Sequence, residues 1–431
     1  MIASAIGRKF LKVYNDHFHT AYGAKDFFVE VFYPLFFDYH KYMMTAGNSP
    51  LENPKISWDK MLCGKVSFET DDRRGERFAK LIDKVENNEP DASIAIGYPS
   101  LDVLATTSSQ VTNLNLGMTR EDVYLSWVGS GLGIGTGALS ILFDKPEILL
   151  DIFSGWKVYR TLLETIPNLR GNQINTWNGQ WLAHRYSKMY MEDDPTANIS
   201  PFSVKDELMS IETKSWTKIL IAIAMRYPDI KEMGYVYTIG QMNTTIGFIP
   251  FVLEQIRRPV ELYQRFFGMD DGLKAEQLYG TAFSFTKACQ EGCIGVKALE
   301  PKGVREYISN GKLPKYDKEN EEKRVSFKTY QIWILAMLNN EELWVKAREL
   351  ANELRTYEGG AVQAKSDRTN RVKAVLQSTR KNVFIESLVP IVSEISNKAT
   401  IENIAALVNT MPTDNVPYFL TLLRFQYAVI Q

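Results

Sequence analysis

Hydrophobic residues recur at helical spacing along much of this sequence. Phe28, Phe32 and Phe36 repeat every four residues, which predicts a buried helical face near the N-terminus. A longer apolar stripe predicts a helix over 144–166, with Pro146 in its first turn. Asp144 and Glu147 have the spacing of a capping pair at its start.

Between these helical stretches, other segments have a different pattern. Residues 93–117 are rich in β-branched and hydroxyl side chains, which predicts short strands with loops. The glycine run at 129–137 lacks the spacing of a dinucleotide-binding or Walker A motif, so it indicates close backbone packing. Residues 202–311 are predicted to be mostly helical, with interruptions at Pro228, in 234–247 and at Pro259.

The pattern is consistently helical beyond residue 326. Apolar stripes predict one helix that begins at Asn339 with Glu342 and another that begins at Ser366. The helix from Ser366 has Val372, Val375, Leu376 and Val383 on one side. Two more helices are predicted over 400–411 and 417–430. Short connections between amphipathic helices are typical of an antiparallel bundle. We therefore expect a mainly α protein with a smaller α+β or irregular N-terminal region. The expected parts are an N-terminal α+β domain over 1–311, a charged linker over 312–325 and a C-terminal helical bundle over 326–431.

Composition indicates an ordinary folded protein. The 431 residues are 45% apolar and 23% charged, and the formal net charge is −1. Whole-molecule attraction to nucleic acid or to an anionic membrane is therefore not expected. Three scattered cysteines favour a reducing compartment, and the N-terminus reads as mature protein, so we expect a cytoplasmic location. Two uncharged runs, 125–143 and 233–253, approach membrane-spanning length, but their glycines and amides favour buried segments, and no membrane is expected among the partners.

A basic stretch at 359–381 gives the strongest functional signal. Six cations stand against the single acid Asp367, namely Lys365, Arg368, Arg371, Lys373, Arg380 and Lys381. Arg368 and Arg371 fall near the start of the predicted helix, where free backbone N–H groups also favour phosphate. Lys373, Arg380 and Lys381 project from the side of the helix, so the stretch could hold a nucleic-acid backbone independently of sequence. A solvated helix face explains the same residues.

A second candidate site is the segment 171–181. Side-chain amides alternate here with Trp177 and Trp181, and these amides are Asn172, Gln173, Asn175, Asn178 and Gln180. Amides can read base edges and indoles can stack on bases. Asn-rich turns also use such amides to satisfy their own backbone.

Catalytic signals are weak. Asp16, His17 and His19 form a D-H-x-H cluster without a further visible ligand, and His184 has no evident nucleophile partner. We predict structural roles for the histidines, no cofactor, no metal site and no enzymatic activity. Two alternatives stay open: a metal- or acid-base-dependent enzyme built on His17, His19 or His184, and a structural subunit of some other assembly.

Four segments resemble the large subunit of type I CRISPR effector complexes (Cascade). They are GNSP at 47–50, GWxxYR at 155–160, INTWNGQW at 174–181 and VPYFLTLLRFQYA at 416–428. That family combines an irregular N-terminal domain with a C-terminal helical bundle. This N-terminal half lacks the paired zinc-type cysteines of some branches, which argues against a metal site.

The resemblance implies a non-catalytic subunit of an RNA-guided DNA surveillance complex that serves in antiviral defence. Its partners would be guide RNA, target DNA, the other Cascade subunits and a recruited helicase-nuclease. The N-terminal domain would recognise a short motif beside the target, a role that fits the amides at 172–180 and Asn48. The bundle would hold the displaced strand, a role that fits the cations at 365–381. Base pairing with the guide would supply sequence specificity.

Overall fold

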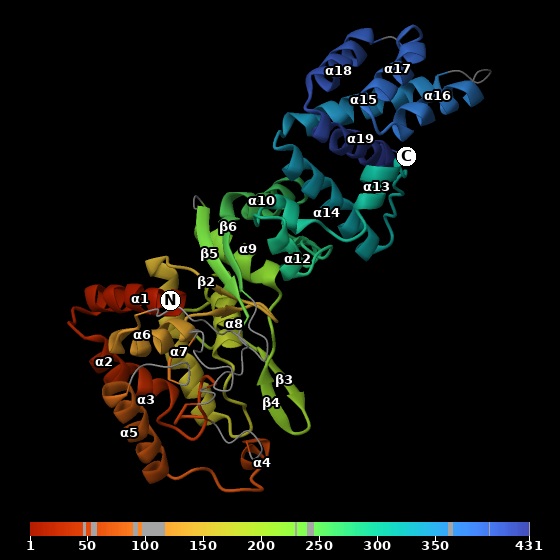
Figure 1. The fold of residues 1–431 in the computed structure, drawn as a ribbon. Helices are drawn as coiled ribbons and strands as arrows, with labels where there is room; N and C mark the ends of the chain where they lie inside the picture. The colour runs from red at the N-terminus through yellow and green to blue at the C-terminus, as the bar shows by residue number, and fades with distance from the viewer. Residues whose placement is uncertain are drawn as a thin grey trace. The chain divides into compact units, whose positions relative to one another are not determined.

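The computed structural model describes residues 1–45, 49–52, 58–88, 94–96, 117–228, 231–238, 245–360, 365–395 and 397–430. These residues are mainly helical with a small antiparallel β-sheet region, which confirms the predicted fold class (Figure 1). The chain forms two compact units, Met1–Leu253 and Glu254–Gln431. The strands predicted within 93–117 fall almost entirely outside the described residues.

The division between the units differs from the predicted one at 312–325. Residues 254–311 belong with the C-terminal helices, because α11 (Gly272–Glu276) contacts α14 (Glu321–Leu338) and α13 (Arg305–Asn310) contacts α19 (Val416–Ile430). The Asn320 side chain caps α14, so the end of the predicted linker is the first turn of a helix. The polar segment is thus a connection inside one unit, which corrects the predicted boundary.

In the first unit, α1 (Ile2–Phe18) and α6 (Arg120–Gly131) pack closely through glycine. A Cβ on Gly7 would lie 2.1 Å from a backbone oxygen of α6, and a Cβ on Gly129 would lie 1.9 Å from a backbone oxygen of α1. A side chain at either position would force the helices apart. The close packing predicted for the glycine run at 129–137 is therefore confirmed at its first glycine.

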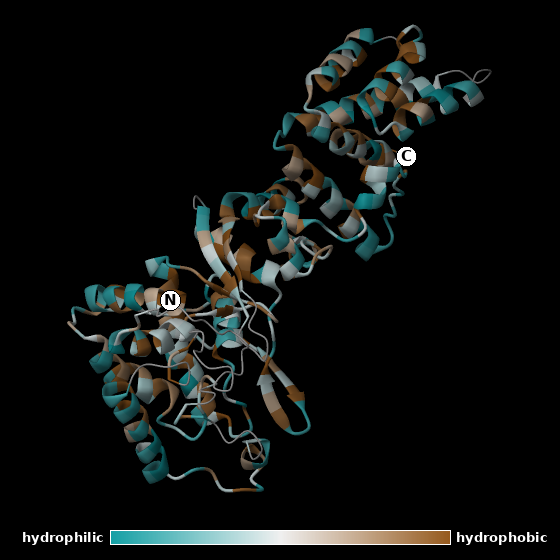
Figure 2. Ribbon diagram, in the orientation of Figure 1, coloured by the Kyte–Doolittle hydropathy of each residue, from teal (hydrophilic) through white to brown (hydrophobic). Residues whose placement is uncertain are grey.

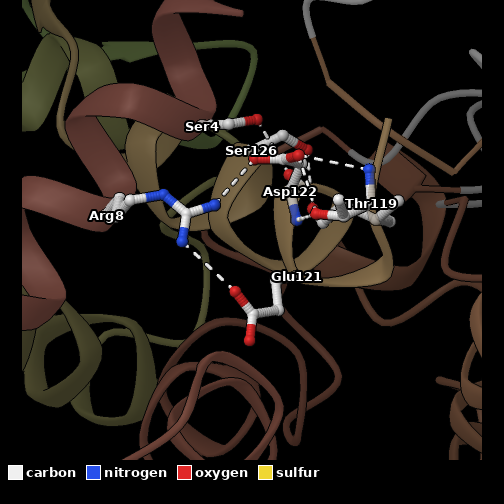
Figure 3. A network of polar contacts seen from close by, with 7 residues as sticks. Ser4, Arg8, Thr119, Glu121, Asp122 and Ser126 are labelled. Carbon is white, nitrogen blue, oxygen red and sulfur yellow. Dashed lines mark hydrogen bonds and ion pairs between the residues drawn. The ribbon is translucent and has the colours of Figure 1, made fainter. Parts of the chain in front are cut away.

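Polar contacts secure the same helix pair (Figure 3). Arg8 on α1 forms ion pairs with Asp122 at 2.9 Å and Glu121 at 3.2 Å. Ser4 donates a hydrogen bond to the Asp122 carbonyl at 2.8 Å. Thr119 and Asp122 form a reciprocal capping box that starts α6. This network therefore belongs to a structural joint.

Aromatic residues fill the core of this unit. They come from α2 (Ala24–Phe27), the π-helical turn Phe28–Phe32, α3 (Tyr33–Phe36) and α7 (Pro146–Thr165). Phe32 and Phe36 stack at 4.1 Å between ring centroids, and Phe36 meets Trp156 edge-on at 4.8 Å. Phe28, Phe32 and Phe36 are fully buried, which confirms the face predicted from their spacing.

The start of α7 corrects one detail. Pro146 is the first helical residue, as predicted, but the residue before the helix is Lys145, which makes no side-chain cap. Asp144 lies one residue too early to cap, and Glu147 forms an ion pair with Lys145 at 3.3 Å. Further helices of this unit are α4 (Trp58–Leu62), α5 (Asp71–Asn87), α8 (Ile174–Arg185) and α9 (Trp216–Arg226). Figure 2 shows hydrophilic residues along much of α5.

An antiparallel sheet joins segments that are far apart in sequence. Its order is β1 (Ile134–Gly135), β2 (Ser140–Leu142), β5 (Lys231–Tyr237) and β6 (Thr245–Val252), and β3 (Phe202–Lys205) pairs with β4 (Leu208–Ile211). The prediction of a mostly helical 202–311 is therefore wrong for its first part. Gly and Pro are uncommon in strands, yet Gly234 pairs with Ile249 and Pro250 pairs with Met233 in the β5–β6 ladder.

The second unit is helical. Its elements are α10 (Leu253–Phe267), α11, α12 (Phe285–Gln290), a 3-10 turn at Val296–Leu299, α13, α14, α15 (Glu342–Gly359), α16 (Lys365–Gln377), α17 (Lys381–Val392), α18 (Lys398–Thr410), a 3-10 turn at Thr413–Asn415 and α19. Pro259 lies inside α10 and does not interrupt it, which corrects that prediction. α19 contacts α13, α14, α15 and α16, so it forms the centre of this unit.

Two boundaries in this unit differ from the prediction. Asn339 ends α14 in a left-handed conformation and does not start α15, whose Glu342 N–H bonds to the Asn340 side chain. The helix predicted from Ser366 to Val383 is two helices, α16 and α17, separated by residues 378–380. No helix among the described residues is long and apolar enough to cross a membrane.

Candidate nucleic-acid interface

The two arginines near the start of α16 contact protein. Arg371 donates to Glu394 Oε1 at 2.5 Å, and Arg368 donates to Glu394 Oε2 at 3.2 Å. Arg368 also donates to the Tyr357 carbonyl at 3.1 Å, and its guanidinium lies 4.6 Å from the Tyr357 ring centroid. The hydrogen bond from Arg371 lowers the pKa of Glu394, and the same bond raises the pKa of Arg371. One carboxylate thus pairs with both arginines, which leaves the three side chains with a net charge of +1.

Lys381 has a structural role as well. Its ammonium group donates to the carbonyls of Asn409 at 2.7 Å and Met411 at 2.9 Å, at the C-terminal end of α18. A cation at a helix C-terminus satisfies free carbonyls and the negative end of the helix dipole. The hydrogen bonds of Lys381 therefore connect α17 to the end of α18.

Lys373 and Arg380 remain as exposed cations. Lys373 projects from the last half of α16, and Arg380 is the residue that precedes α17. Within the described part of the chain, neither side chain forms an ion pair or a hydrogen bond. The Lys365 side chain lies outside the described residues. The six predicted cations thus divide into three that bind protein, two that are unpaired and one that is undescribed.

The geometry of α16 separates these cations into two sites. Val372, Val375 and Leu376 are buried and form the inner stripe of the helix. At about 100° per residue, Arg371 and Lys373 lie about 200° apart, on opposite flanks of that stripe. One continuous groove cannot therefore include both without crossing the exposed side of the helix. The predicted lateral set on one helix is wrong, because Arg380 precedes α17 and Lys381 is its first residue, so only Lys373 of the three lies on α16.

A buried arginine holds the turn between α16 and α17 in place. Arg424 on α19 is 1% exposed and donates to the carbonyls of Leu376 at 2.7 Å and Ser378 at 3.1 Å. It also donates to the carbonyl of Tyr307 on α13. Burial lowers the pKa of Arg424 to about 10, so it stays charged at neutral pH. Arg424 therefore links three elements of the unit.

The backbone of Gly311 packs against this turn. Gly311 has a φ of +62°, and a Cβ there would lie 2.8 Å from the Gln377 carbonyl oxygen and 3.3 Å from a Thr379 methyl. Lys312 follows directly and is exposed, in an ion pair with Glu306 at 2.6 Å. The name "α16–α17 basic turn" is used below for Lys373 and Arg380, because the Lys312 ammonium group is paired with Glu306. The location of Lys312 next to this segment could not be predicted, because Lys312 lies more than sixty residues before Lys373.

The amide segment is a helix rather than a loop. Asn178, on α8, is fully buried and donates to the carbonyls of Gly131 at 2.8 Å and Gly133 at 2.9 Å. The Gln180 amide, 5% exposed, donates to the Glu212 carbonyl at 2.7 Å. These groups fasten α8 to neighbouring backbone and face the interior, so the structure opposes a base-reading role for them.

The other members of this segment also make contacts within the protein. The Asn175 amide donates to Ser140 Oγ at 3.3 Å, and Gln173 Oε1 accepts from the Ile211 N–H at 3.0 Å. Asn172 has a φ of +56°, and its N–H donates to the Tyr42 carbonyl at 2.7 Å. Asn48 lies outside the described residues.

The two tryptophans of the segment are also core residues. The Trp177 indole donates to the Gly155 carbonyl and the Trp181 indole to the Asp151 carbonyl, both at 2.7 Å. Gly155 allows α7 to approach α8, because a Cβ there would lie 2.4 Å from the Trp181 ring. Two of the segments that carried the family resemblance, 155–160 and 174–181, therefore pack against each other.

The histidines do not converge on a site. His17 and His19 are exposed, and His19 ends α1 in a left-handed conformation. The His184 ring lies 3.1 Å from the Pro195 carbonyl oxygen. Among the residues that the structure describes, no group of three or more His, Cys, Asp or Glu side chains could hold a metal ion.

Comparison with known proteins gives no relative. No family model, no curated protein and no solved structure matches this chain.

Proposed function

We propose that this chain is a non-catalytic nucleic-acid-binding protein that holds a sugar–phosphate backbone at the α16–α17 basic turn. The observation that carries the proposal is the exposure of Lys373 and Arg380 without any described partner. An unpaired cation on a fixed scaffold can neutralise a phosphate without first breaking an internal contact. Arg424 supplies that scaffold by holding the end of α16 and the residues that follow it.

The more specific part of the proposal is membership of a cytoplasmic, RNA-guided DNA surveillance complex as a large, Cascade-like subunit. A mainly helical chain with a C-terminal helical unit supports it, as do the four segments of resemblance. Guide RNA, target DNA, the other subunits and a helicase-nuclease would be the partners. Holding the displaced strand is the role that fits the basic turn. Asn48 remains a candidate for motif recognition, whereas Asn178 and Gln180 are too buried for it.

Binding to unrelated oligonucleotides tests the proposal. The full chain should bind single-stranded DNA and RNA of several sequences with similar affinities, because backbone contacts carry no sequence information. The double variant Lys373→Ala/Arg380→Ala should weaken binding by a similar factor on every sequence. A matched control removes two other exposed cations of the same unit, Arg348→Ala/Lys398→Ala, and should change affinity less. Equal losses in both variants, or no binding by the wild type, would contradict the proposal.

A further inference from the structure

The Glu394 carboxylate is held by three converging donors. Arg371 donates to Oε1 at 2.5 Å, while Arg368 and the Tyr357 hydroxyl donate to Oε2 at 3.2 Å and 3.3 Å. These donors come from α15 and α16, and Glu394 itself lies in the turn after α17. An oxyanion therefore already occupies the space between them.

The donors are fixed independently of the carboxylate they hold. Arg368 is anchored by its bond to the Tyr357 carbonyl and by the Tyr357 ring beneath its guanidinium. Arg371 makes a second, longer contact to the Pro390 carbonyl at 3.4 Å. Guanidinium groups present paired donors that suit both carboxylate and phosphate oxygens. The nearby N-terminal end of α16 adds a positive potential.

The carboxylate, by contrast, can leave. The Glu394 side chain is 38% exposed, and exposed ion pairs contribute little to stability. Two acids of α15 are engaged elsewhere, because Glu358 pairs with Arg355 and Glu353 accepts a hydrogen bond from Asn397. Rotation of the Glu394 side chain into solvent would leave Arg368 and Arg371 facing a vacant anion position.

We infer that Arg368, Arg371 and Tyr357 form a second backbone phosphodiester site, which Glu394 fills until nucleic acid displaces it. The inference rests on the proposed function and gives a role to the carboxylate that both arginines share in the free protein. The phosphodiester replaces the carboxylate on the same donors. Glu394 thereby weakens binding by competing with each phosphate for the site.

The variant Glu394→Gln separates this role from a structural one. This variant keeps the size of the side chain and removes its charge, so single-stranded DNA should bind more tightly. The expected gain in affinity is about fivefold, which corresponds to the free energy of an exposed ion pair. One additional phosphate contact would steepen the salt dependence of log K by about 0.7. The matched control is Glu386→Gln, which removes an exposed charge from α17 and should have a smaller effect on both quantities.

The triple variant Glu394→Gln/Arg368→Ala/Arg371→Ala should lose the gain. Equal gains in affinity from Glu394→Gln and Glu386→Gln would show that the effect comes from net charge alone, and this result would overturn the inference. Unchanged affinity in Glu394→Gln, with wild-type binding that still depends on Lys373 and Arg380, would overturn the inference alone. Absence of binding by the wild type and by every variant would instead overturn the proposed function.

Discussion

The Arg424 guanidinium donates a 2.7 Å hydrogen bond from Nε to the Leu376 carbonyl, across 48 residues of sequence. Arg424 has no acidic partner among the described residues, and backbone carbonyls accept its hydrogen bonds together with Thr421. Its planar fork thus satisfies carbonyls left free at the ends of helical segments. This side chain thus holds the end of α16 and the residues that follow it.

Substituting Arg424 should destabilise the second unit. Arg424→Met would leave several buried carbonyls without a donor, and we expect a loss of about 3 kcal/mol in the free energy of unfolding. Arg424→Lys retains the charge but cannot reach all the carbonyls, so its loss should be intermediate. Denaturant titration measures both. A loss below about 0.5 kcal/mol in Arg424→Met would contradict the scaffold role.

The α1–α6 joint gives a prediction with an internal control. Gly7→Ala and Gly129→Ala place a methyl group against backbone that cannot move aside, so each should cost about 2 kcal/mol or more. Gly75→Ala lies on α5 with open space around it and should stabilise the protein by up to about 1 kcal/mol. Thermal melts compare the three variants. Similar changes in melting temperature for Gly7→Ala and Gly75→Ala would show that the close contact is absent.

Asn178 distinguishes packing from recognition. Asn178→Ala removes the donor for two buried carbonyls, and we expect a cost of about 2 kcal/mol with no change in nucleic-acid sequence preference. Denaturant titration and competition between oligonucleotides measure the two quantities. An altered preference in a variant of normal stability would restore the base-reading interpretation.

His40 should make stability depend on pH. Its ring lies 3.9 Å from the ring centroids of both Tyr39 and Phe68, and burial, assisted by Lys41 and other nearby cations, lowers its pKa to about 4. An unfolded histidine has a pKa of about 6.5. Between these values the unfolded chain binds a proton that the folded chain does not, so stability falls as pH drops from about 6.5 to about 4.

His40→Phe keeps a ring in the stack but removes the titrating group. The free energy of unfolding of this variant should decline less than that of the wild type over the same pH range. Denaturant titrations at several pH values measure the difference. Parallel pH profiles for wild type and variant would contradict the assigned cause.

Local patterns in the sequence predicted those elements whose contacts are local. Phe28, Phe32 and Phe36 repeat along one helical face, and burial of that face follows from their spacing. The β2–β5 pairing joins Ile141 to Val236, and no local pattern reveals a partner almost a hundred residues away. Asn-rich composition suggested a loop at 171–181, but tertiary hydrogen bonds from Asn178 and Gln180 stabilise a helix there.

The candidate site could be predicted only in part, because local sequence patterns do not show which distant residues come into contact. Charge composition identified the cations of α16, but it could not show that Glu394, more than twenty residues later, forms ion pairs with Arg368 and Arg371. Lys381 was read as a surface cation, yet it caps the end of α18. Which cations are unpaired is a property of the tertiary fold.

The most direct test of the account is the salt dependence of single-stranded DNA binding by the full chain. Each neutralised phosphate contributes about 0.7 to the slope of log K against log salt concentration. The account predicts that Lys373→Ala/Arg380→Ala flattens this slope by about 1.4 relative to the wild type, with little change in Arg348→Ala/Lys398→Ala. An identical slope in the wild type and the Lys373/Arg380 variant would contradict it.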